Sequence, residues 1–490
     1  MIKKILFASI ALLCSTQFYS QIPCVDGMAG DYPCDGYDLM GHMTLSELGI
    51  PSDGNDCWGW TDPEFGNEYA IMGGVNRTVF VDITDPSNLI FVGYMPTATS
   101  NSIWRDMKVY DNHAFIVSEA GGHGMQVFDL TRLRDVSSPP DIFDEDAYYD
   151  GFGNAHNIAI NEATGYAYPI GTQMFDGGPM FINIQDPLNP VLEGGFDGDG
   201  YTHDAQIIEY DGPDVEHQCQ EIFFGYNANT LTIVDITDKT DPQVLSITGY
   251  ENTGYTHQGW LNEDRTIVYL NDETDELNFG NNTRTIILDV SDLDNPVLLD
   301  EYFGETAAID HNLYVNGDKV FEANYNAGMR VLQTSDDPDN RLDEIGFFDV
   351  NPNSNSAGFN GSWSLYPFFE SGNIVISAID QGLFVVASTS ININHTDPML
   401  VDCSVGVEEF LQANFGVYPN PTNGEINLTF ENQLQLELIT ISDIVGKVVR
   451  VERPKTITNE SYKMDVGSLF PGAYFLTINN ETKSQKIIIE

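Results

Sequence analysis

Along most of the chain, short runs of valine, isoleucine, phenylalanine and tyrosine alternate with polar residues and stop at turn-forming pairs such as Asp-Pro, Asn-Pro and Gly-Gly. Alternation with a period of two is typical of β-strands, because successive side chains point to opposite faces of a sheet. Runs with the helical period of 3.6 are scarce. The pattern therefore predicts an all-β protein made of many short strands.

One strand-and-turn phrase recurs along the chain. Its clear copies are VDITDPSN at 81–88, INIQDPLNP at 182–190, VDITDKTDP at 234–242 and LDVSDLDNP at 288–296. Proline ends a strand, and an aspartate side chain caps the turn that follows. Each copy is predicted to be a strand that turns back into a further short strand.

A second phrase, GYTH, occurs at 200–203 and again at 254–257. The residues at the place of its histidine recur every 47 to 54 positions, and they are Trp58, Arg105, His156, His203, His257, His311 and Trp363. A period near 50 with about four strands per unit is typical of propeller blades, and seven units close a ring. The sequence predicts a seven-bladed β-propeller over residues 21–390.

The last repeat, at 362–386, supplies only three strands. The segment YDLMGHM at 37–43 resembles LIFVGYM at 89–95, which stands at the same place ahead of a blade. We expect residues 37–43 to supply the missing strand, because this closure removes the exposed edges that invite aggregation.

The first twenty residues combine two lysines, an apolar stretch and a small residue before Gln21. We expect a secretory signal peptide at 1–20, since the stretch is too short to span a membrane. No other stretch is long and apolar enough to cross one, so no membrane insertion is expected.

Removal of the signal peptide leaves five cysteines, which are Cys24, Cys34, Cys57, Cys219 and Cys403. Disulfides are permitted in an exported protein, and Cys24 and Cys34 flank a glycine-rich turn, so we expect these two to pair. An odd number leaves at least one thiol unpaired.

The formal net charge of -54 argues against nucleic-acid binding and against anionic membranes. A solvated acidic surface explains it, and binding of divalent cations is the alternative. Residues 415–490 differ, with 7 Lys+Arg against 9 Asp+Glu. This shift predicts a domain boundary, with residues 391–414 as linker.

The phrase VDITDP resembles the LVIVD-type repeat of secreted bacterial proteins. The segments CWGWTDP (57–63), WRDMKVY (104–110) and HAFIVSEAGGHGMQVFDLTRLR (113–134) are similar to the choice-of-anchor B family, over about residues 22–395. Members of that family share this body and differ in the signal that anchors them. The resemblance implies a surface or secreted propeller and no particular activity.

The tail resembles the type A C-terminal sorting domain of the type IX secretion system of Bacteroidetes. The matching segments are FGVYPNPTNG (415–424), LITISDIVGKVV (438–449) and PGAYFLTI (471–478). Their alternating strands and glycine turns predict a small β-sandwich. The resemblance implies that the secretion machinery is a partner, and that the protein is released or attached to the outer cell surface after this domain is removed.

Loops that lead into the innermost strands of a propeller open on one face. We therefore expect His156, His203, His257 and His311 around one mouth of the central channel, with Arg105, Trp58 and Trp363 at equivalent places. Four imidazoles at one radius could bind a transition metal. Polar residues follow the anchors, and they are Asp106, Asn157, Asp204, Gln258 and Asn312. Arg105, Trp58, Trp363, Asp106 and Asp204 are the candidate contacts for a ligand.

Loops on the same face add Glu119 with His123, Asp272 with Glu273, and Asp380. Carboxylates beside imidazoles could hold a metal such as Zn²⁺ or Ca²⁺, orient a histidine, or act as a general base. We include Glu119 and His123 with the four histidines as candidate metal ligands. The alternative is that each histidine is a hydrogen-bonding pin between loop and strand.

The sequence thus predicts an exported, monomeric, non-enzymatic propeller that binds a glycan or protein at its histidine-bearing face. The alternative is a metal-dependent hydrolase or lyase that uses the same mouth of the channel. No catalytic residue is assigned.

Overall fold

The computed structural model describes residues 21–395, 400–401, 403, 415–435, 438–443, 447–454, 458–478 and 485–489. The chain forms two compact units, Met1–Cys403 and Ser404–Glu490. The expected signal peptide at 1–20 lies outside the described residues. In the described part nearly all regular structure is β, apart from one short α-helix, α1 (Asp275–Phe279), and two 3-10 turns at Leu130–Asp135 and Phe175–Gly177. This confirms the predicted all-β fold class.

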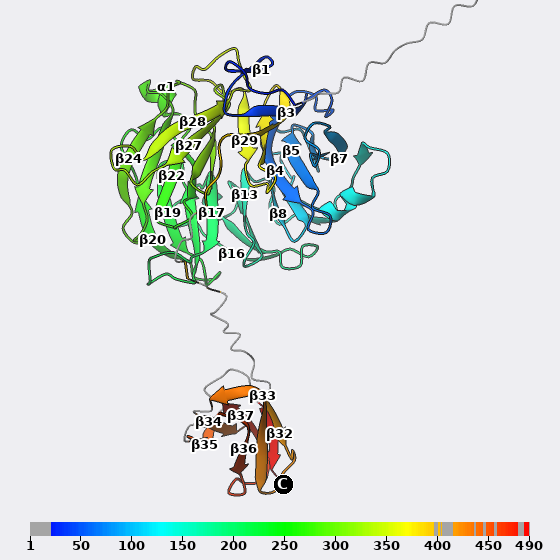
Figure 1. Ribbon diagram of the computed structural model, residues 1–490, viewed down its shortest axis with the longest axis vertical. Helices are drawn as coiled ribbons and strands as arrows, with labels where there is room; N and C mark the ends of the chain where they lie inside the picture. Colours follow the sequence, from blue (N-terminus) through cyan, green and yellow to red (C-terminus); the bar gives the residue numbers. More distant parts are fainter. Residues whose placement is uncertain are drawn as a thin grey trace, which may run out of the picture. The chain divides into compact units, whose positions relative to one another are not determined.

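The strands of residues 21–395 form seven sheets, the blades of a propeller (Figure 1). Blade 1 contains β4 (Gly54–Thr61), β5 (Glu68–Gly74), β6 (Arg77–Asp82) and β7 (Ile90–Pro96), with β11 (Asp141–Ile142) added to β7. Blade 2 contains β8 (Arg105–Tyr110), β9 (His113–Ser118), β10 (Met125–Asp129) and β12 (Ala147–Tyr149). Blade 3 contains β13 (Asn157–Asn161), β14 (Tyr166–Ile170), β15 (Met180–Asn183) and β16 (Val191–Gly195).

The remaining blades repeat this arrangement. Blade 4 contains β17 (Asp204–Glu209), β18 (Glu221–Tyr226), β19 (Leu231–Asp235) and β20 (Gln243–Thr248). Blade 5 contains β21 (Thr256–Leu261), β22 (Ile267–Asp272), β23 (Arg284–Asp289) and β24 (Val297–Phe303). Blade 6 contains β25 (Asn312–Asn316), β26 (Lys319–Ala323), β27 (Met329–Thr334) and β28 (Leu342–Phe348), extended by β2 (Tyr32–Asp35) and β1 (Met28–Ala29).

Blade 7 joins the two ends of the propeller. It contains β29 (Ser362–Tyr366), β30 (Asn373–Ala378), β31 (Gly382–Ala387) and the N-terminal strand β3 (Asp38–Met43). Strand β3 runs antiparallel to β31, with Asp38 opposite Ala387 and Met43 opposite Leu383. Because β3 comes from the other end of the chain, it ties blade 7 to the segment that precedes blade 1.

The recurrent phrase has a structural cause. In blades 1, 3, 4 and 5 the pairing of the third and fourth strands shifts register at the first residue of the phrase. The following aspartate then accepts a hydrogen bond from the backbone N–H two residues later, at 2.9 Å for Asp82 and Asp235 and 2.8 Å for Asp289. A bulge bends the strand and an aspartate closes the turn, so blades 1, 4 and 5 have the same residue types at the same place.

Hydrophobic clusters fill the spaces between neighbouring blades. Phe80 of blade 1, for example, stacks on Phe128 of blade 2 at a centroid distance of 4.6 Å. In blades 6 and 7, Phe321 and Phe384 lie in one cluster, and the N-terminal residues Tyr37 and Leu39 are buried in it. Burial of apolar area between all seven pairs of blades stabilises the ring.

The propeller contains two disulfide bonds, of which one is predicted from the sequence. Cys24 and Cys34 form the expected disulfide, Cys57 is free and buried, and Cys219 pairs with Cys403. The first unit accordingly extends to Cys403, beyond the start of the predicted linker at residue 391. The described residues of this segment contact the propeller, as where Asn394 donates a hydrogen bond to Asp318 at 2.9 Å.

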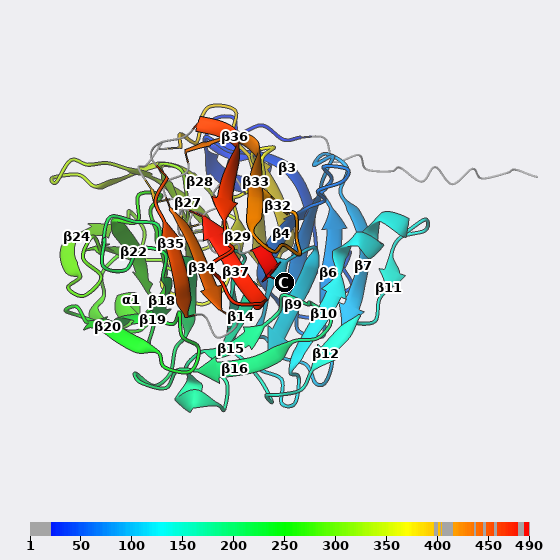
Figure 2. The same cartoon turned by 90° about the horizontal axis from the view of Figure 1, so that it is seen from below.

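The second unit contains two sheets that enclose one apolar cluster. One sheet has β32 (Phe415–Tyr418), β33 (Glu425–Gln435) and β36 (Thr458–Asp465). The other has β35 (Val448–Glu452), β34 (Ile439–Asp443), β37 (Gly472–Ile478) and β38 (Gln485–Ile489), of which Figure 2 shows β35, β34 and β37 side by side. This is the small β-sandwich that the sequence predicts.

Candidate functional site

The first strand of each blade lines the central channel. These inner strands contact one another in order around the ring, from β4 and β8 through β13, β17, β21 and β25 to β29 and back to β4. A residue at the start of an inner strand therefore lies at one mouth of the channel, beside the matching residue of the next blade.

Four histidines meet at this mouth. His156, His203 and His311 directly precede their inner strands, and their backbone N–H groups donate to the second strands of their own blades at 2.8, 2.9 and 3.0 Å, respectively. His257 is the second residue of β21. Neighbouring rings lie 4.2 Å (His156 to His203), 4.0 Å (His203 to His257) and 4.2 Å (His257 to His311) apart, centroid to centroid. We call these four residues the histidine cluster. The indole of Trp363 continues the row, 5.1 Å from His311.

The Nδ1 atoms of three of these histidines are held by neighbouring residues. Nδ1 of His203 donates to the backbone carbonyl of His257 at 3.0 Å, and Nδ1 of His311 donates to that of Trp363 at 2.5 Å. His156 Nδ1 donates to the Glu119 carboxylate at 2.6 Å. Since Nδ1 carries the proton, Nε2 keeps its lone pair. From the sequence, the hydrogen-bonding pin and the metal ligand are alternative roles of these histidines. In the structure the two roles use different nitrogens of the same ring.

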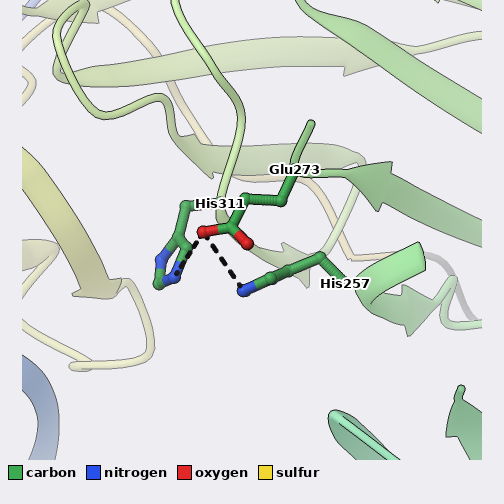
Figure 3. A group of neighbouring side chains, drawn as sticks. All are labelled: His257, Glu273 and His311. Carbon is green, nitrogen blue, oxygen red and sulfur yellow. Dashed lines mark ion pairs between the residues drawn. The ribbon is translucent and has the colours of Figure 1, made fainter. Parts of the chain in front are cut away.

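Glu273 lies between two members of the histidine cluster (Figure 3). Its Oε1 is 3.9 Å from His257 Nε2 and 3.8 Å from His311 Nε2, too far for hydrogen bonds, and Tyr325 donates to the same oxygen at 2.8 Å. One ligand atom from each of His257, Glu273 and His311 fits within 4.8 Å of the others. His257 is 1% exposed, and neither of its ring nitrogens makes a hydrogen bond of ordinary geometry. A buried polar nitrogen without a partner is costly, and a bound cation would satisfy it.

Burial keeps three members of the histidine cluster neutral, namely His203, His257 and His311. Burial lowers the pKa of His203 and of His257 well below the usual value, and neighbouring imidazoles lower both further. Burial also lowers the pKa of His311 to about 3, although its bond to Trp363 acts in the opposite direction. These imidazoles are therefore unprotonated at neutral pH, the form that binds metals. Burial raises the pKa of Glu273.

His123, predicted as a metal ligand, is not available for that role. Its Nε2 accepts a hydrogen bond from Arg105 Nη1 at 2.9 Å, and its Nδ1 donates to the Gly124 carbonyl at 3.0 Å. Arg105 itself is 2% exposed and also donates to Gly74 and Thr97. The structure thus pairs Arg105 with His123 between blades 1 and 2 and brings neither to the histidine cluster.

Trp58 does not occupy the histidine position of blade 1. The shift in the pairing of β4 between Gly54 and Cys57 matches the shift in β21 between Thr256 and Gly259, which places Asn55 opposite His257 in the comparison of the two blades. Asp56 Oδ1 accepts the N–H of Cys57 at 2.7 Å, as Asp106 Oδ1 accepts that of the residue after it at 2.7 Å. Asn55 therefore stands where blades 3 to 6 have histidine. Trp58 lies deeper in the channel, 5.1 Å from Tyr366 by ring centroids. Blade 1 lacks a GYTH phrase, so nothing in its sequence marks Asn55 as the residue at this position.

Asp106 and Asp204, predicted as ligand contacts, belong instead to a buried charged layer below the histidine cluster. The layer comprises Asp56, Asp106, Asp204 and Lys108, whose Nζ lies 2.7 Å from Asp106 Oδ1. Burial raises the pKa of Asp56 to about 7 and that of Asp204 well above the usual value. Burial alone would lower the pKa of Lys108, but the three carboxylates raise it. Sequence reasoning missed Asp56 and Lys108, because neither belongs to a repeated phrase.

Below this layer lies a cavity of about 260 Å³, lined by Trp58, Trp260 and Tyr314 among other residues. Asp380, the remaining predicted carboxylate, is held on the surface by Asn360 and Gln381. Among the helices of the described residues, none is long and apolar enough to cross a membrane.

Two protein families match parts of this chain. The family described as "Secretion system C-terminal sorting domain" matches residues 416–490, and the LVIVD repeat family matches residues 67–97 and 223–248, which lie in blades 1 and 4. No curated protein matches the chain.

Solved β-propellers resemble the chain in structure at low sequence identity. The β-propeller domain of Cps50 (Swd1) from Myceliophteria thermophila has 10% identity and a TM-score of 0.43, covering 66% of this chain and 94% of its own. The WD40 repeats of RRP9 have 11% identity and a TM-score of 0.45, covering 69% and 95%. A protein from Lactobacillus plantarum has 11% identity and a TM-score of 0.44, covering 84% and 99%.

The sorting-domain match and the blades together fix the class of the molecule. It is a β-propeller with LVIVD repeats whose C-terminal sorting domain directs type IX secretion, so the protein is exported to the cell surface or the extracellular space.

Proposed function

We propose that this exported propeller is a metal-dependent binding protein, in which the histidine cluster holds a divalent transition-metal ion and the ligand meets the protein at that ion. The observation that carries the proposal is the row of neighbouring imidazoles, 4.0 to 4.2 Å apart, in which Nδ1 is bonded at three positions and Nε2 is left with a lone pair.

The donor set favours one class of metal. Imidazole nitrogens with one carboxylate are typical ligands of Zn²⁺ and other first-row transition metals, whereas Ca²⁺ takes oxygen ligands. Of the two ions predicted from the sequence, Zn²⁺ therefore fits the histidine cluster. Glu273 supplies the carboxylate, and Glu119 orients His156 as carboxylates often orient metal-bound histidines.

Aromatic side chains beside the site suit an organic ligand. The ring of Tyr255 lies 5.3 Å from that of His203, and the Trp363 indole lies at the end of the row. Sugars and peptides present apolar faces that stack on such rings and oxygen atoms that coordinate metals. The resemblance of residues 22–395 to choice-of-anchor B proteins fits a binding propeller held at the surface or released from it.

The protein, stripped with chelator and reloaded with Zn²⁺, is expected to retain about one equivalent of zinc after desalting. The double variant His203→Ala/His257→Ala is expected to lose it, with affinity lowered about 100-fold or more, since even outer partners of a metal site are worth 10- to 100-fold. Elemental analysis measures the content, and competition with a zinc chelator measures the affinity.

His113→Ala is the matched control for this experiment. His113 is the first residue of β9, where its ring bonds the Asp111 carbonyl, and zinc content should not change. Equal zinc in the double variant, or none in the unaltered protein, would show that the histidines serve only as pins between blades.

A second candidate function is metal-dependent hydrolysis or elimination at the same mouth. The observation that favours it is Glu119, a carboxylate with 29% of its side chain exposed beside His156. Such a group can take a proton from a metal-bound water. If this function is correct, the zinc-loaded protein should turn over a substrate in a screen of esters, glycans and peptides, and Glu119→Gln should abolish that turnover while leaving zinc bound. Absence of turnover in the zinc-loaded protein would contradict the catalytic function and favour the binding function.

A further inference from the structure

A second group of ligand-type side chains lies in blade 5 and at the start of blade 6, outside the histidine cluster. Asp275 and Glu276 open α1, and Asp310 directly precedes His311 and β25. All three are buried, and one carboxylate oxygen from each fits within 4.8 Å of the others. We call these residues the acidic trio.

Three carboxylate oxygens of the acidic trio, two of Glu276 and one of Asp310, have no hydrogen-bond partner. Glu276 is 4% exposed, and neither of its carboxylate oxygens is bonded. Asp310 is 0% exposed, and its Oδ1 is also unbonded, while its Oδ2 accepts only a long bond of 3.3 Å from the Asp272 N–H. Buried carboxylates usually accept several hydrogen bonds, so these oxygens point to a missing partner with positive charge.

Nearby positive charge does not balance the trio. Arg284 is the neighbouring cation, and it pairs with Asp275 at 2.5 Å, with Glu301 at 2.7 Å and with Asp272 at 3.5 Å. It leaves Glu276 and Asp310 without compensation. Burial and the adjacent Asp275 raise the pKa of Glu276 to about 9. The group must therefore hold either protons or a cation.

We propose that Asp275, Glu276 and Asp310 bind a Ca²⁺ ion. The donors are oxygen atoms only, the set preferred by hard cations. Ca²⁺ accepts irregular oxygen cages with few waters, whereas Mg²⁺ keeps several waters and demands octahedral geometry, which a buried site does not favour. An exported, acidic protein works in surroundings where weak Ca²⁺ sites are filled.

The site explains how the loop that carries Glu273 is held. Asp272, at the end of β22, accepts the N–H groups of Gly254 (2.8 Å) and Tyr255 (2.5 Å), the first two residues of the second GYTH phrase. Glu273 reaches the histidine cluster, and Asp275 and Glu276 follow at once. A Ca²⁺ ion on the acidic trio would fix this short loop from its far side. The inference is independent of a metal in the histidine cluster.

Chelator-stripped protein is titrated with Ca²⁺ in 150 mM KCl at pH 7.5, with Mg²⁺ as comparison. Calorimetry should show one site above the weak binding of the acidic surface. Binding of Ca²⁺ should raise the midpoint of thermal unfolding by about 3 °C. Tryptophan fluorescence measures this midpoint for the propeller, because all five tryptophans lie between residues 58 and 363. In Glu276→Gln the affinity for Ca²⁺ should fall about tenfold or more, because the charge of the ligands sets it.

Glu276→Gln without Ca²⁺ should be at least as stable as the unaltered protein, because a buried acid that must hold a proton at pH 7.5 is replaced by a neutral amide of similar size. Asp310→Asn is the second variant should the first not fold. Glu301→Gln, which changes a partner of Arg284 outside the trio, should keep the Ca²⁺ response. His203→Ala/His257→Ala should keep it as well, which separates this site from the histidine cluster. A stripped protein that shows no thermal shift, or a Glu276→Gln variant that responds in full, would overturn the proposal.

Discussion

Deletion of residues 21–43 is expected to abolish cooperative folding of the propeller. This segment supplies β3 to blade 7 and β2 to blade 6, so it holds together the two blades at the end of the repeat. It also buries Cys34, Tyr37 and Leu39 in the cluster between those blades. Full burial of each large side chain contributes about 1.5–3 kcal/mol, so the loss approaches the 5–15 kcal/mol by which a whole domain is stable.

Urea titration followed by tryptophan fluorescence tests this directly, because the five tryptophans all belong to the propeller and report nothing from the second unit. The unaltered protein should show one steep transition. The deleted protein should show a broad one, or none, in the same range.

A peptide of residues 21–46 added to the deleted protein should restore the transition, since strand β3 pairs through its backbone with β31. The same peptide with Leu39→Asp should fail, because Leu39 is buried between the blades. A deleted protein with the midpoint of the unaltered one would show that three strands suffice for blade 7.

The architecture could be predicted because the features that build it are local. Blades 1, 4 and 5 repeat a bulge followed by an aspartate-capped turn, as at Asp82 and Asp235, and both features depend on neighbouring residues. The number of blades can therefore be predicted from the period of the sequence repeat. The closing strand was visible for the same reason, since residues 37–43 have the pattern of an outer strand.

The candidate site could be predicted only where the repeat continued into it. His156, His203, His257 and His311 occupy equivalent positions, so the ring geometry places them together. Blade 1 has the same register shift as blade 5 but carries Asn55 in place of the histidine, so its sequence does not show which residue matches His257 and Trp58 is a wrong prediction for that place.

Contacts between different loops carry no such periodicity. The direction of the Arg105 side chain toward His123 follows from the packing of blades 1 and 2, and nothing in either segment indicates it. Glu276 and Asp310 are far apart in sequence. They meet only because β22 ends, and β25 begins, at the same face of the propeller. Such pairs become visible only once the ring is closed.

Lys108→Met is expected to lower the free energy of unfolding of the propeller by about 3 kcal/mol at pH 8. Lys108 is the cation of the buried layer, 2.7 Å from Asp106 and close enough to Asp56 and Asp204 that each raises its pKa. Removing one partner of a buried ion pair costs about 3–5 kcal/mol, and the lower end applies because the Lys108 side chain is 14% exposed beside the channel cavity. Urea titration with tryptophan fluorescence measures the change.

Lys319→Met is the matched control. Lys319 is a buried lysine of blade 6 that pairs with Asp318 at 2.6 Å, but Asp318 is more exposed than Asp106 and also accepts hydrogen bonds from Gln333 and Asn394. Its carboxylate therefore keeps partners when the lysine is gone. The loss of stability should be clearly smaller than for Lys108→Met.

The loss of stability caused by Lys108→Met should also depend on pH, and the buried carboxylates beside Lys108 determine whether the loss grows or shrinks as the pH falls. Burial raises the pKa of Asp56 in the folded protein to about 7, well above that of an unfolded aspartate. A carboxyl with a raised pKa stabilises the fold most below its unfolded pKa, and that contribution is lost as pH rises through 7. Near pH 5 Asp56 is protonated in both proteins and the layer has less negative charge for Lys108 to balance, so the deficit of the variant should shrink. A deficit equal at pH 8 and pH 5 would mean that Lys108 acts by packing on Trp58, whose ring its Nζ approaches to 4.6 Å, and not by charge.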